Sequence, residues 1–433
     1  MSARLPSEHA VAVEHALKTL THNRRTGSMD GFTYDFTCPS PSSYPFQWAW
    51  DSCFHAIALA RTDTARARAE IESLLHGVDV HGFLPHMLLW QEDLRARASQ
   101  DFRMAVWDGW KSVSLAPPVL ARAIERIHEV DGDEQWLHQV LPVTCRYYDW
   151  LHRTRRTGTG LLAIHHPDES GLDSSPKYDT ALGIESGTGP EVARAWHARM
   201  SDILAAYSPG RRPDSDLSRH GRFHWADVLF NSIYADGLAR LARLVARAAT
   251  YGPDAGRRFA ERAEQVSAAL MRECWDSEKG CFHDLDLLAA RREETLTISS
   301  LFPVIVEHIP DPVARRVIDD HLTNTDEFWL PYPLPSVAAN EPAFDPDFTT
   351  EAIFRGSSWV NLNWYLYWGL RARGAREAAG VLAARTIAVA ASAGMRECYG
   401  PYSGQGHGAV SFGWSSLVLD LIDAEAREPG GER

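Results

Sequence analysis

The segment from His165 to Pro176 combines side chains that can transfer protons with residues that interrupt regular secondary structure. It reads HHPDESGLDSSP and carries three carboxylates, at Asp168, Glu169 and Asp173. Its prolines and its glycine predict a loop rather than one helix or one strand. Such a segment, taken alone, is more often a solvated acidic turn than a functional site. Carboxyl groups also serve as general acids and bases, so the rest of the chain must separate the two interpretations.

Aromatic residues gather beside short polar ones in four further segments. The chain has 15 tryptophans, and the segments read YPFQWAWD (44–51), AVWDGWK (105–111), FRGSSWVNLNW (354–364) and FGW (412–414). A tryptophan next to a short polar side chain offers a flat apolar face and a hydrogen-bond donor, which suits a pyranose ring. The alternative for each tryptophan is a place in the core. The candidates for sugar binding are Tyr44, Trp48, Trp50, Asp51, Trp107, Asp108, Trp359 and Trp414.

The composition of the chain excludes several classes of protein. A net charge of −13 argues against nucleic-acid binding, which needs clustered Lys and Arg to neutralise phosphates. No apolar run approaches the roughly 18–20 residues that span a bilayer, and residues 1–21 lack the apolar core of a signal peptide. Six scattered cysteines without a CxxC pair predict reduced thiols and no zinc site. We expect a cytoplasmic protein without metal or cofactor that binds a small molecule, with a homo-oligomer left open.

Apolar residues recur at helical spacing along most of the chain. The pattern is clearest over residues 224–249, where Trp225, Val228, Leu229 and Ile233 fall on one side. Asp51 is expected to cap the N-terminus of its helix. The predicted helices span residues 8–20, 51–61, 64–78, 114–129, 135–153, 190–206, 224–249, 256–275, 296–308, 312–321, 358–371, 376–393 and 411–424.

About a dozen helices in succession predict an all-α fold, because evidence for strands is limited to short pieces such as residues 280–284. No Gly/Ser-rich linker divides the chain. We therefore expect a single domain over residues 1–433, folded as an (α/α)6 barrel of six helical hairpins around a central cavity, with long loops forming the mouth. A helical solenoid is the competing architecture, but no repeat of fixed period supports it.

Five motifs, in this order along the chain, resemble those of glycoside hydrolase family 63. They are YPxxWxWD (44–51), ESGxDxSP (169–176), LPSV (334–337), RGxxW (355–359) and FGWS (412–415). The sequence is most similar to the short bacterial members, the mannosylglycerate and glucosylglycerate hydrolases, and more distantly to trehalases. The likeness covers nearly the whole chain. It implies an (α/α)6 barrel that hydrolyses an α-glycosidic bond and inverts the anomeric configuration.

The resemblance also implies the two carboxyl groups of that reaction. Asp173 corresponds to the general acid, and Glu397, in ECYGPYSG (397–404), corresponds to the base that activates water. In inverting enzymes two such groups lie about 6.5–9.5 Å apart. Asp173 must then be kept protonated near neutral pH by burial or by negative charge nearby. Glu169 is expected to supply that charge or to bind sugar hydroxyls.

Other polar residues near the motifs are expected in supporting roles. Arg355 and Gly356, at a helix start, are expected to contribute to sugar binding in the cavity, and the alternative is an ion pair of Arg355 with Asp347 or Glu351. No cluster has the spacing of metal ligands. The histidines expected to be hydrogen-bonded structural residues are His81, His86, His165 and His166.

Three positions depart from the resembling enzymes, and they leave the sugar and the aglycone open. Asp168 stands in place of a tryptophan, Ala116 in place of a glutamine, and Gly400 in place of a second glutamate. We predict an inverting, exo-acting α-glycosidase for a small α-glucoside or α-mannoside, with a glycosylglycerate the first substrate and disaccharides next. One alternative is a sugar epimerase or isomerase on the same barrel, which would need histidine proton relays. The other is a non-catalytic sugar-binding protein, which would not need both carboxyl groups.

Overall fold

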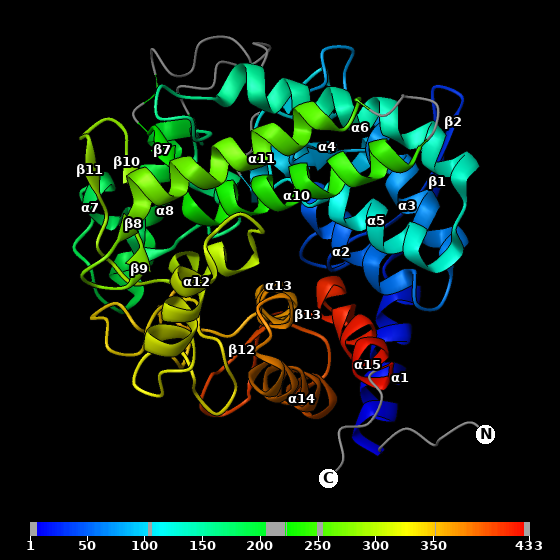
Figure 1. Ribbon diagram of the computed structural model, residues 1–433. Coiled ribbons are helices and arrows are strands. Elements are labelled where there is room, and N and C mark those ends of the chain that lie inside the picture. Colours follow the sequence, from blue (N-terminus) through cyan, green and yellow to red (C-terminus); the bar gives the residue numbers. More distant parts are fainter. Residues whose placement is uncertain are drawn as a thin grey trace.

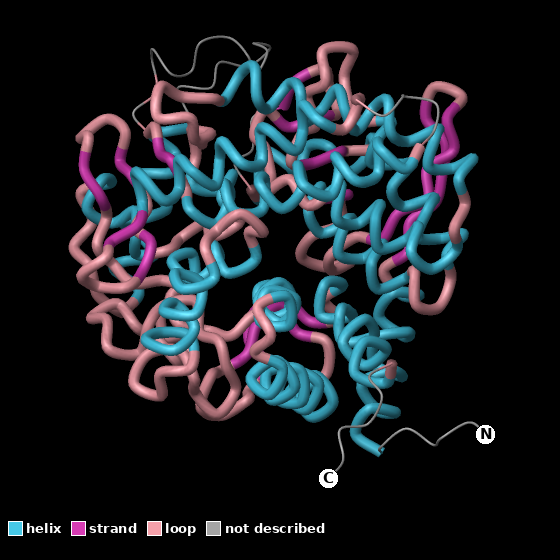
Figure 2. The backbone as a smooth tube through the Cα atoms, in the orientation of Figure 1, coloured by secondary structure: helices cyan, strands magenta, loops and turns pink. Residues whose placement is uncertain are grey.

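The described part of the chain is largely helical. The computed structural model describes residues 7–102, 106–204, 221, 223–248, 254–350 and 352–427, without the side chains of Ser99, Trp107 and Leu204. Helices surround the centre of the molecule in Figures 1 and 2. The first helix, α1 (Ser7–His22), contacts the last, α15 (Val418–Ala426), so the two ends of the described chain lie side by side.

Six helical segments of the described chain form an inner ring: α2 (Ala49–Leu59), α5 (Leu120–Asp131), α10 (Val228–Arg247), η6 (Ile298–Ile305), α13 (Val360–Ala372) and η8 (Gly413–Leu417), which continues into α15. Each contacts the next in this order, and η8 contacts α2, so the ring is closed. All eleven residues of α2 and all eight of η6 are buried. Fully burying a Leu or Phe side chain contributes about 1.5–3 kcal/mol, which makes this ring the core of the fold.

The outer ring consists of helices that bury only one face. In α11, for example, Phe259, Ala263 and Val266 are buried at helical spacing while the residues between them face outward. The chain alternates between the rings, and the predicted (α/α)6 barrel is confirmed. The outer helices are α1, α3 (Thr64–His76), α6 (Glu134–Arg155), α11 (Arg257–Ala269), α12 (Asp311–Val317) and α14 (Arg376–Ala393). The single-domain organisation over residues 1–433 stays a prediction.

Short strands connect the helices, and most of them escaped the sequence analysis. The antiparallel hairpin β12–β13 and the hairpin β1–β2 are the longest, and most other strands have two residues. Alternation of polar and apolar residues cannot reveal so short a strand. The strands are β1 (Arg24–Met29), β2 (Phe32–Thr37), β3 (Gln47–Trp48), β4 (Met87–Leu88), β5 (Val106–Trp107), β6 (Lys111–Ser112), β7 (Trp225–Ala226), β8 (Trp275–Asp276), β9 (Cys281–Phe282), β10 (Leu285–Asp286), β11 (Arg291–Arg292), β12 (Arg396–Tyr399) and β13 (Gly406–Val410).

Several predicted helix boundaries were wrong. The segment 296–308 forms the 3-10 helix η6, with Pro303 inside it, because proline removes a donor of the α-helical pattern. The segment 256–275 leaves the α-helical pattern after Ala269 and continues as the π turn η5 (Leu270–Cys274). The helix α2 begins at Ala49, so Asp51 is its third residue and does not cap it as predicted.

Long connections that lead from the outer ring to the inner ring carry additional helices. Between α3 and α5 lie η1 (Glu92–Leu94) and α4 (Arg95–Asp101). Between α6 and α10 lie η2 (Pro167–Ser170), η3 (Pro176–Tyr178), α7 (Asp179–Leu182) and α8 (Pro190–Leu204), and the π turn η7 (Ile318–Leu322) follows α12. These connections converge where the inner helices begin, so they can enclose a site there.

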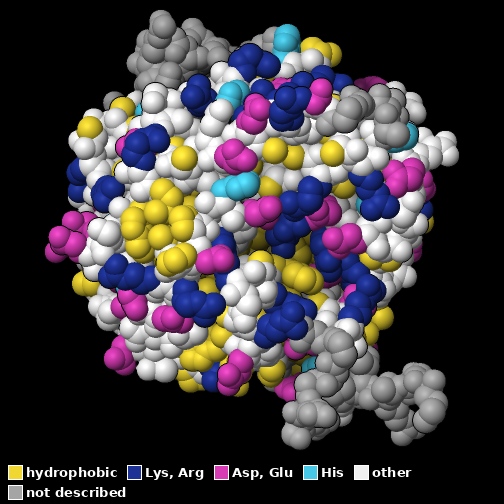
Figure 3. Space-filling model, viewed as in Figure 1, with side chains coloured by type: hydrophobic (Ala, Val, Ile, Leu, Met, Phe, Trp, Pro, Cys, Tyr) yellow, Lys and Arg dark blue, Asp and Glu magenta, His cyan; other side chains and the backbone are white. Residues whose placement is uncertain are grey.

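On the face shown in Figure 3, acidic and basic side chains are interspersed, so the negative net charge does not gather into one field there. Among the described helices, none combines the length and the apolar character needed to cross a membrane.

Candidate active site

A cavity of about 490 Å³ opens at the end of the barrel where inner helices begin. Trp50 and Asp51 of the first turn of α2 line it, and Phe412 and Trp414 at the start of η8 line it from the adjoining position. Its volume falls in the range of roughly 300–1,000 Å³ that is usual for small-molecule sites. The described lining includes five acidic side chains and no Lys or Arg: Asp51, Asp101, Asp168, Asp173 and Glu397.

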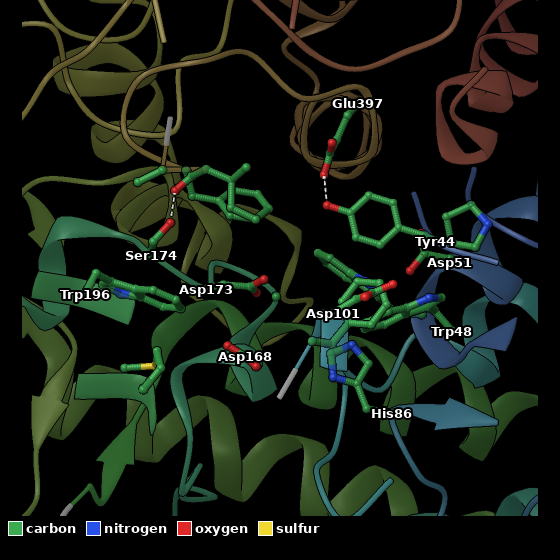
Figure 4. A pocket seen from close by; sticks show the side chains of 18 of the residues that line it. Tyr44, Trp48, Asp51, His86, Asp101, Asp168, Asp173, Ser174, Trp196 and Glu397 are labelled. Carbon is green, nitrogen blue, oxygen red and sulfur yellow. Dashed lines mark hydrogen bonds between the residues drawn. The ribbon is translucent and has the colours of Figure 1, made fainter. Parts of the chain in front are cut away.

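The loop between α6 and α10 brings Asp168 and Asp173 to the same wall of the cavity. Figure 4 shows both side chains projecting from this loop into the open space. Between them Gly171 has a φ of +73°, a left-handed conformation that ends η2. A Cβ atom at Gly171 would lie 2.5 Å from the Trp50 ring. A glycine is therefore required for the loop to rest on Trp50.

The surroundings of Asp173 favour the protonated form of its carboxyl group. Burial raises the pKa of Asp173 well above its ordinary value, and the negative charges of Asp168, Glu397 and Asp51 raise it further. A protonated carboxyl group that faces a cavity can donate a proton to a bound molecule. Asp173 is therefore suited to the part of a general acid.

Glu397 is held on β12 by two hydrogen-bond donors. The Tyr44 hydroxyl donates to its Oε1 at 3.0 Å, and the Ala409 backbone N–H donates to its Oε2 at 2.7 Å. Burial raises the pKa of Glu397, and these two hydrogen bonds oppose the rise because they favour the charged form. Figure 4 shows Glu397 pointing into the cavity from a different side than Asp173. An ionised carboxylate held in this way can accept a proton from water.

Gly408 makes the position of Glu397 possible. The pairing of β12 with β13 shifts at Glu397, where β13 contains one extra residue. Gly408 has a φ of +65° in this bulge, and a Cβ atom there would lie 2.4 Å from Oε2 of Glu397. The bulge turns the backbone N–H of Ala409 toward the carboxylate, and only a glycine leaves room for it.

Aromatic rings and a further carboxyl group surround the two catalytic candidates. Burial, with added charge from Glu397 and Glu70, raises the pKa of Asp51 well above its ordinary value. The Trp414 ring packs edge-on against Trp50, with 5.5 Å between ring centroids. Its Nε1 donates to the backbone oxygen of Glu397 at 3.1 Å. The cavity thus combines flat apolar faces with polar groups, as a sugar ring requires. Among the described residues, no group of His, Cys, Asp and Glu is arranged to hold a metal ion.

Comparison with known proteins decides the family of the chain. The model of the mannosylglycerate hydrolase MGH1-like glycoside hydrolase domain matches residues 44–415, nearly the whole chain. The chain belongs to this family. As a member of the MGH1-like family it is a glycoside hydrolase, which confirms the predicted class of enzyme. The alternatives of an epimerase and of a non-catalytic sugar-binding protein are set aside.

The similar proteins cover almost the full length of the chain. A mannosylglycerate hydrolase of Thermus thermophilus is 30% identical, over 88% of this chain and 95% of that protein. A glucosylglycerate hydrolase of Mycolicibacterium hassiacum is 26% identical, over 89% and 94%. The crystal structure of a family 63 mannosylglycerate hydrolase from a second strain of Thermus thermophilus, with Tris and D-glycerate, superposes with a TM-score of 0.78, at 26% identity, covering 95% of this chain and 100% of that one. The neutral trehalase Nth1 of Saccharomyces cerevisiae, 13% identical, shares the fold with a TM-score of 0.60.

Six of the residues that the sequence analysis selected line the cavity in addition to Asp173: Tyr44, Trp48, Trp50, Asp51, Trp414 and Glu397. They come from segments more than three hundred residues apart, and the closed inner ring brings them together. Their roles in the MGH1-like enzyme remain predictions.

Glu169 does not line the cavity, in contrast to its expected role beside Asp173. It is completely buried, and Arg155 donates to both of its oxygens at 2.8 and 2.9 Å. The backbone N–H groups of Leu115 and His165 donate to the same carboxylate at 3.1 and 2.8 Å. Arg155 neutralises the charge of Glu169, so this carboxylate does not supply negative charge to Asp173. Its hydrogen bonds instead anchor the loop that carries Asp173.

Arg355, Gly356 and Trp359 lie behind the cavity wall rather than on it. Arg355 is 1% exposed and pairs with Asp179, not with Asp347, while its expected partner Glu351 lies outside the described residues. The guanidinium also donates to the backbone oxygen of Gly187 at 3.3 Å, and its side chain does not line the cavity.

Backbone and ring packing explain the positions of the two residues that accompany Arg355. Gly356 has a φ of +151°, and a Cβ atom there would lie 2.6 Å from the backbone oxygen of Asp345. Trp359 is completely buried and stacks on Phe354, which lines the cavity, with 3.8 Å between ring centroids. Both residues therefore support the wall from behind.

The hairpin turn after β5 lies away from the cavity. Asp108 is an exposed turn residue with a φ of +55° and a side chain 3.7 Å from Nζ of Lys111. Its expected contact with sugar is therefore not supported by its position. The side chain of Trp107 is outside the described residues.

The structure adds lining residues that sequence reasoning missed. His86, expected to be a hydrogen-bonded structural residue, lines the cavity, and its buried Nδ1 has no hydrogen-bond partner among the described residues. Asp101 at the end of α4 and Trp196 on α8 line it as well. Both helices lie in long connections, and nothing in their periodicity marks a cavity-facing side. Asp168 was noted only as a departure from related sequences, although that departure was itself a usable signal.

Proposed function

We propose that this MGH1-like glycoside hydrolase inverts the anomeric configuration, with Asp173 as general acid and Glu397 as general base. One observation carries the proposal. Two carboxyl groups enter the same cavity from different sides, and their surroundings differ as the reaction requires. Asp173 lies among negative charges that favour its protonated form, while Glu397 accepts two hydrogen bonds that favour its ionised form.

In a single displacement the Asp173 carboxyl group protonates the glycosidic oxygen. The bond between that oxygen and the anomeric carbon breaks as the proton is transferred, so the leaving oxygen departs as a hydroxyl group rather than as an alkoxide. The sugar develops positive charge in the transition state. The carboxyl groups of Asp51 and Glu397 line the cavity in which that charge develops.

In the same displacement Glu397 removes a proton from a water molecule that attacks the anomeric carbon from the face opposite the leaving group, and the new C–O bond forms as the bond to the leaving oxygen breaks. The Tyr44 hydroxyl and the Ala409 N–H orient the carboxylate for this step. A single displacement inverts the configuration, and an α-glycoside therefore releases a β-sugar.

The substrate proposed is a small α-glucoside or α-mannoside cleaved from its end. Relatives named for mannosylglycerate and glucosylglycerate favour a glycosylglycerate first, and α-linked disaccharides come next. A cavity of about 490 Å³ suits a molecule of this size.

The substrate proposal is tested by incubating the full chain with α-mannosylglycerate, α-glucosylglycerate and a set of α-linked disaccharides and measuring the released monosaccharide. Proton NMR in the first minutes then identifies the anomer, and we expect the β-sugar before mutarotation. Release of the α-anomer would exclude a single displacement.

Glycosyl fluorides separate the acid from the base. Fluoride leaves without a proton, so Asp173→Ala is expected to keep much more activity on the matching α-glycosyl fluoride than on the natural glycoside. Glu397→Ala is expected to lose activity on both, because water must still be activated. Glu294→Ala, on an exposed side chain paired with Lys279, is the control carboxylate and should resemble the wild type. Equal losses of Asp173→Ala on both substrates would contradict its role as the acid.

A further inference from the structure

Asp168 occupies the cavity wall beside the proposed acid and is held there by His166. His166 precedes η2, and its Nδ1 accepts the backbone N–H of Asp168 at 3.1 Å. The same nitrogen lies 3.3 Å from the Asp168 carboxylate. His166 is 1% exposed in its side chain, whereas the Asp168 side chain is 19% exposed toward the cavity. The fold thus fixes a carboxylate on the wall that carries Asp173.

His86 lines the cavity as well, and its side chain indicates that a ligand binds against this wall. Its side chain lines the cavity, the residue is 4% exposed, and its Nδ1 has no hydrogen-bond partner in the part of the chain that the structure describes. A buried polar atom of this kind is costly unless a bound molecule satisfies it. Burial lowers the pKa of His86 to about 4, so the imidazole is neutral at neutral pH and leaves the Asp168 charge in place.

We propose that Asp168 is a positioning residue whose negative charge keeps the Asp173 carboxyl group protonated and thereby extends the enzyme's activity toward alkaline pH. The proposal rests on the proposed role of Asp173 as general acid. Asp168 thereby takes the supporting role that the sequence analysis expected of Glu169, whose charge is neutralised by Arg155.

The direction of the effect follows from the charges that face the two groups. Asp173 faces Asp168, Glu397 and Asp51, all of which oppose its ionisation. Burial raises the pKa of Asp168, but its interaction with His166 outweighs burial and lowers that pKa below its ordinary value, so Asp168 ionises before Asp173 does. Two carboxyl groups that share a site do not ionise together, and the second to ionise has its pKa raised.

The test compares Asp168→Asn and Asp168→Glu with the wild type across the pH profile of kcat/KM. The general acid must be protonated, so activity falls on the alkaline limb as Asp173 ionises. Asp168→Asn is expected to move that limb to lower pH by about one unit, because a like charge is removed. Asp168→Glu keeps the charge and is expected to restore the limb. Both variants retain the backbone N–H that His166 accepts.

The α-glycosyl fluoride provides a readout that a merely structural role would not change. Fluoride needs no acid, so on this substrate Asp168→Asn is expected to match the wild type at alkaline pH. An alkaline limb that stays in place in Asp168→Asn, or equal losses on both substrates, would overturn the role of Asp168. Failure of the proposed function looks different, since Asp173→Asn would then keep the wild-type activity and alkaline limb.

Discussion

Buried carboxylates serve opposite purposes in two regions of the barrel. We call one region the arginine cluster, where carboxylates and arginines of the inner helices meet away from the cavity. Asp236 on α10 accepts hydrogen bonds from Arg122 at 3.0 Å and from Arg240 at 2.9 Å. Asp420 on α15 lies 2.7 Å from Arg126 and 2.8 Å from the Trp364 indole nitrogen. Every carboxylate in this cluster has cationic partners: Arg61, Arg122, Arg126 and Arg240 face Glu125, Asp236 and Asp420.

Asp101, at the edge of the cavity, pairs with Arg97 at 2.7 Å, but Asp51, Asp173 and Glu397 have no ion pair with a Lys or Arg among the described residues. No described Lys or Arg side chain lines the cavity. Burial alone would raise the pKa of Asp236, but Arg122 and Arg240 lower it below its ordinary value. Burial raises the pKa of Asp173 in the same way, and its neighbours raise it further. The difference teaches that the nearby guanidinium, not burial, decides whether a buried carboxyl group stabilises the fold or remains able to transfer a proton.

The largest expected effect separates activity from stability at the cavity. Asp173→Asn preserves shape but has no transferable proton, so kcat on the natural glycoside should fall by about 10²–10⁴. The melting temperature should not fall, because the variant removes a carboxyl group that is costly to ionise. Steady-state kinetics and thermal unfolding of the same preparation check both parts. A large loss of stability in Asp173→Asn would contradict the comparison.

In the arginine cluster the opposite result is expected, a loss of stability without a loss of activity. Asp236→Asn leaves Arg122 and Arg240 as buried cations without their shared partner, so the free energy of unfolding should fall by about 3–5 kcal/mol. Urea unfolding measures this loss, and the kcat of the folded enzyme should stay unchanged. Asp311→Asn is the matched control, since its side chain is 84% exposed in a pair with Arg373 and should change stability by less than about 1 kcal/mol. Equal stability of Asp236→Asn and the wild type would mean that the cluster is not structural.

The bulge behind Glu397 provides a smaller effect within the cavity. A methyl group from Gly408→Ala would contact the carboxylate and displace it, and kcat should fall by about tenfold to a hundredfold. Gly374→Ala is the control, because Gly374 also has a positive φ, +75°, but nothing lies near its absent Cβ. Both variants incur the backbone strain, so only the displacement of Glu397 distinguishes their kinetics. Similar kcat values for the two variants would exclude the steric explanation.

The smallest expected effect is an opposite dependence of stability on pH in the two regions. The folded pKa of Asp173 is raised, so the fold binds a proton that the unfolded chain releases above about pH 4, and this group costs stability as pH rises. Asp173→Asn should therefore gain on the wild type with increasing pH. The folded pKa of Asp236 is lowered, so its contribution is present above about pH 4 and is lost as pH falls. Melting temperatures of both variants from about pH 2 to about pH 8 cover both windows and test whether the two differences have opposite signs.

Helical periodicity predicted most of the fold because the outer helices bury one face. The helix α14, for example, has the bounds that the periodicity predicted. Helical periodicity did not reveal the short strands. The hairpin β12–β13 holds Glu397, yet its bulge depends on Gly408, whose need for a positive φ is visible only once the strands are paired. The motifs predicted Asp173 and Glu397 as a pair, but they could not separate Glu169, which faces Arg155, from Asp168, which faces the cavity.

The sequence by itself determined the class of the protein. The spacing of apolar residues specifies helices, and the order of the aromatic and acidic motifs along residues 44–415 specifies the family. Only the tertiary structure decided which carboxyl groups are neutralised and which face the cavity. Arg122, which pairs with Asp236, and Arg155, which pairs with Glu169, come from other elements, and no local pattern encodes a contact between residues 114 or 14 positions apart. Ionisation depends on the charges and the water that surround a group, and the packing of the two rings sets both.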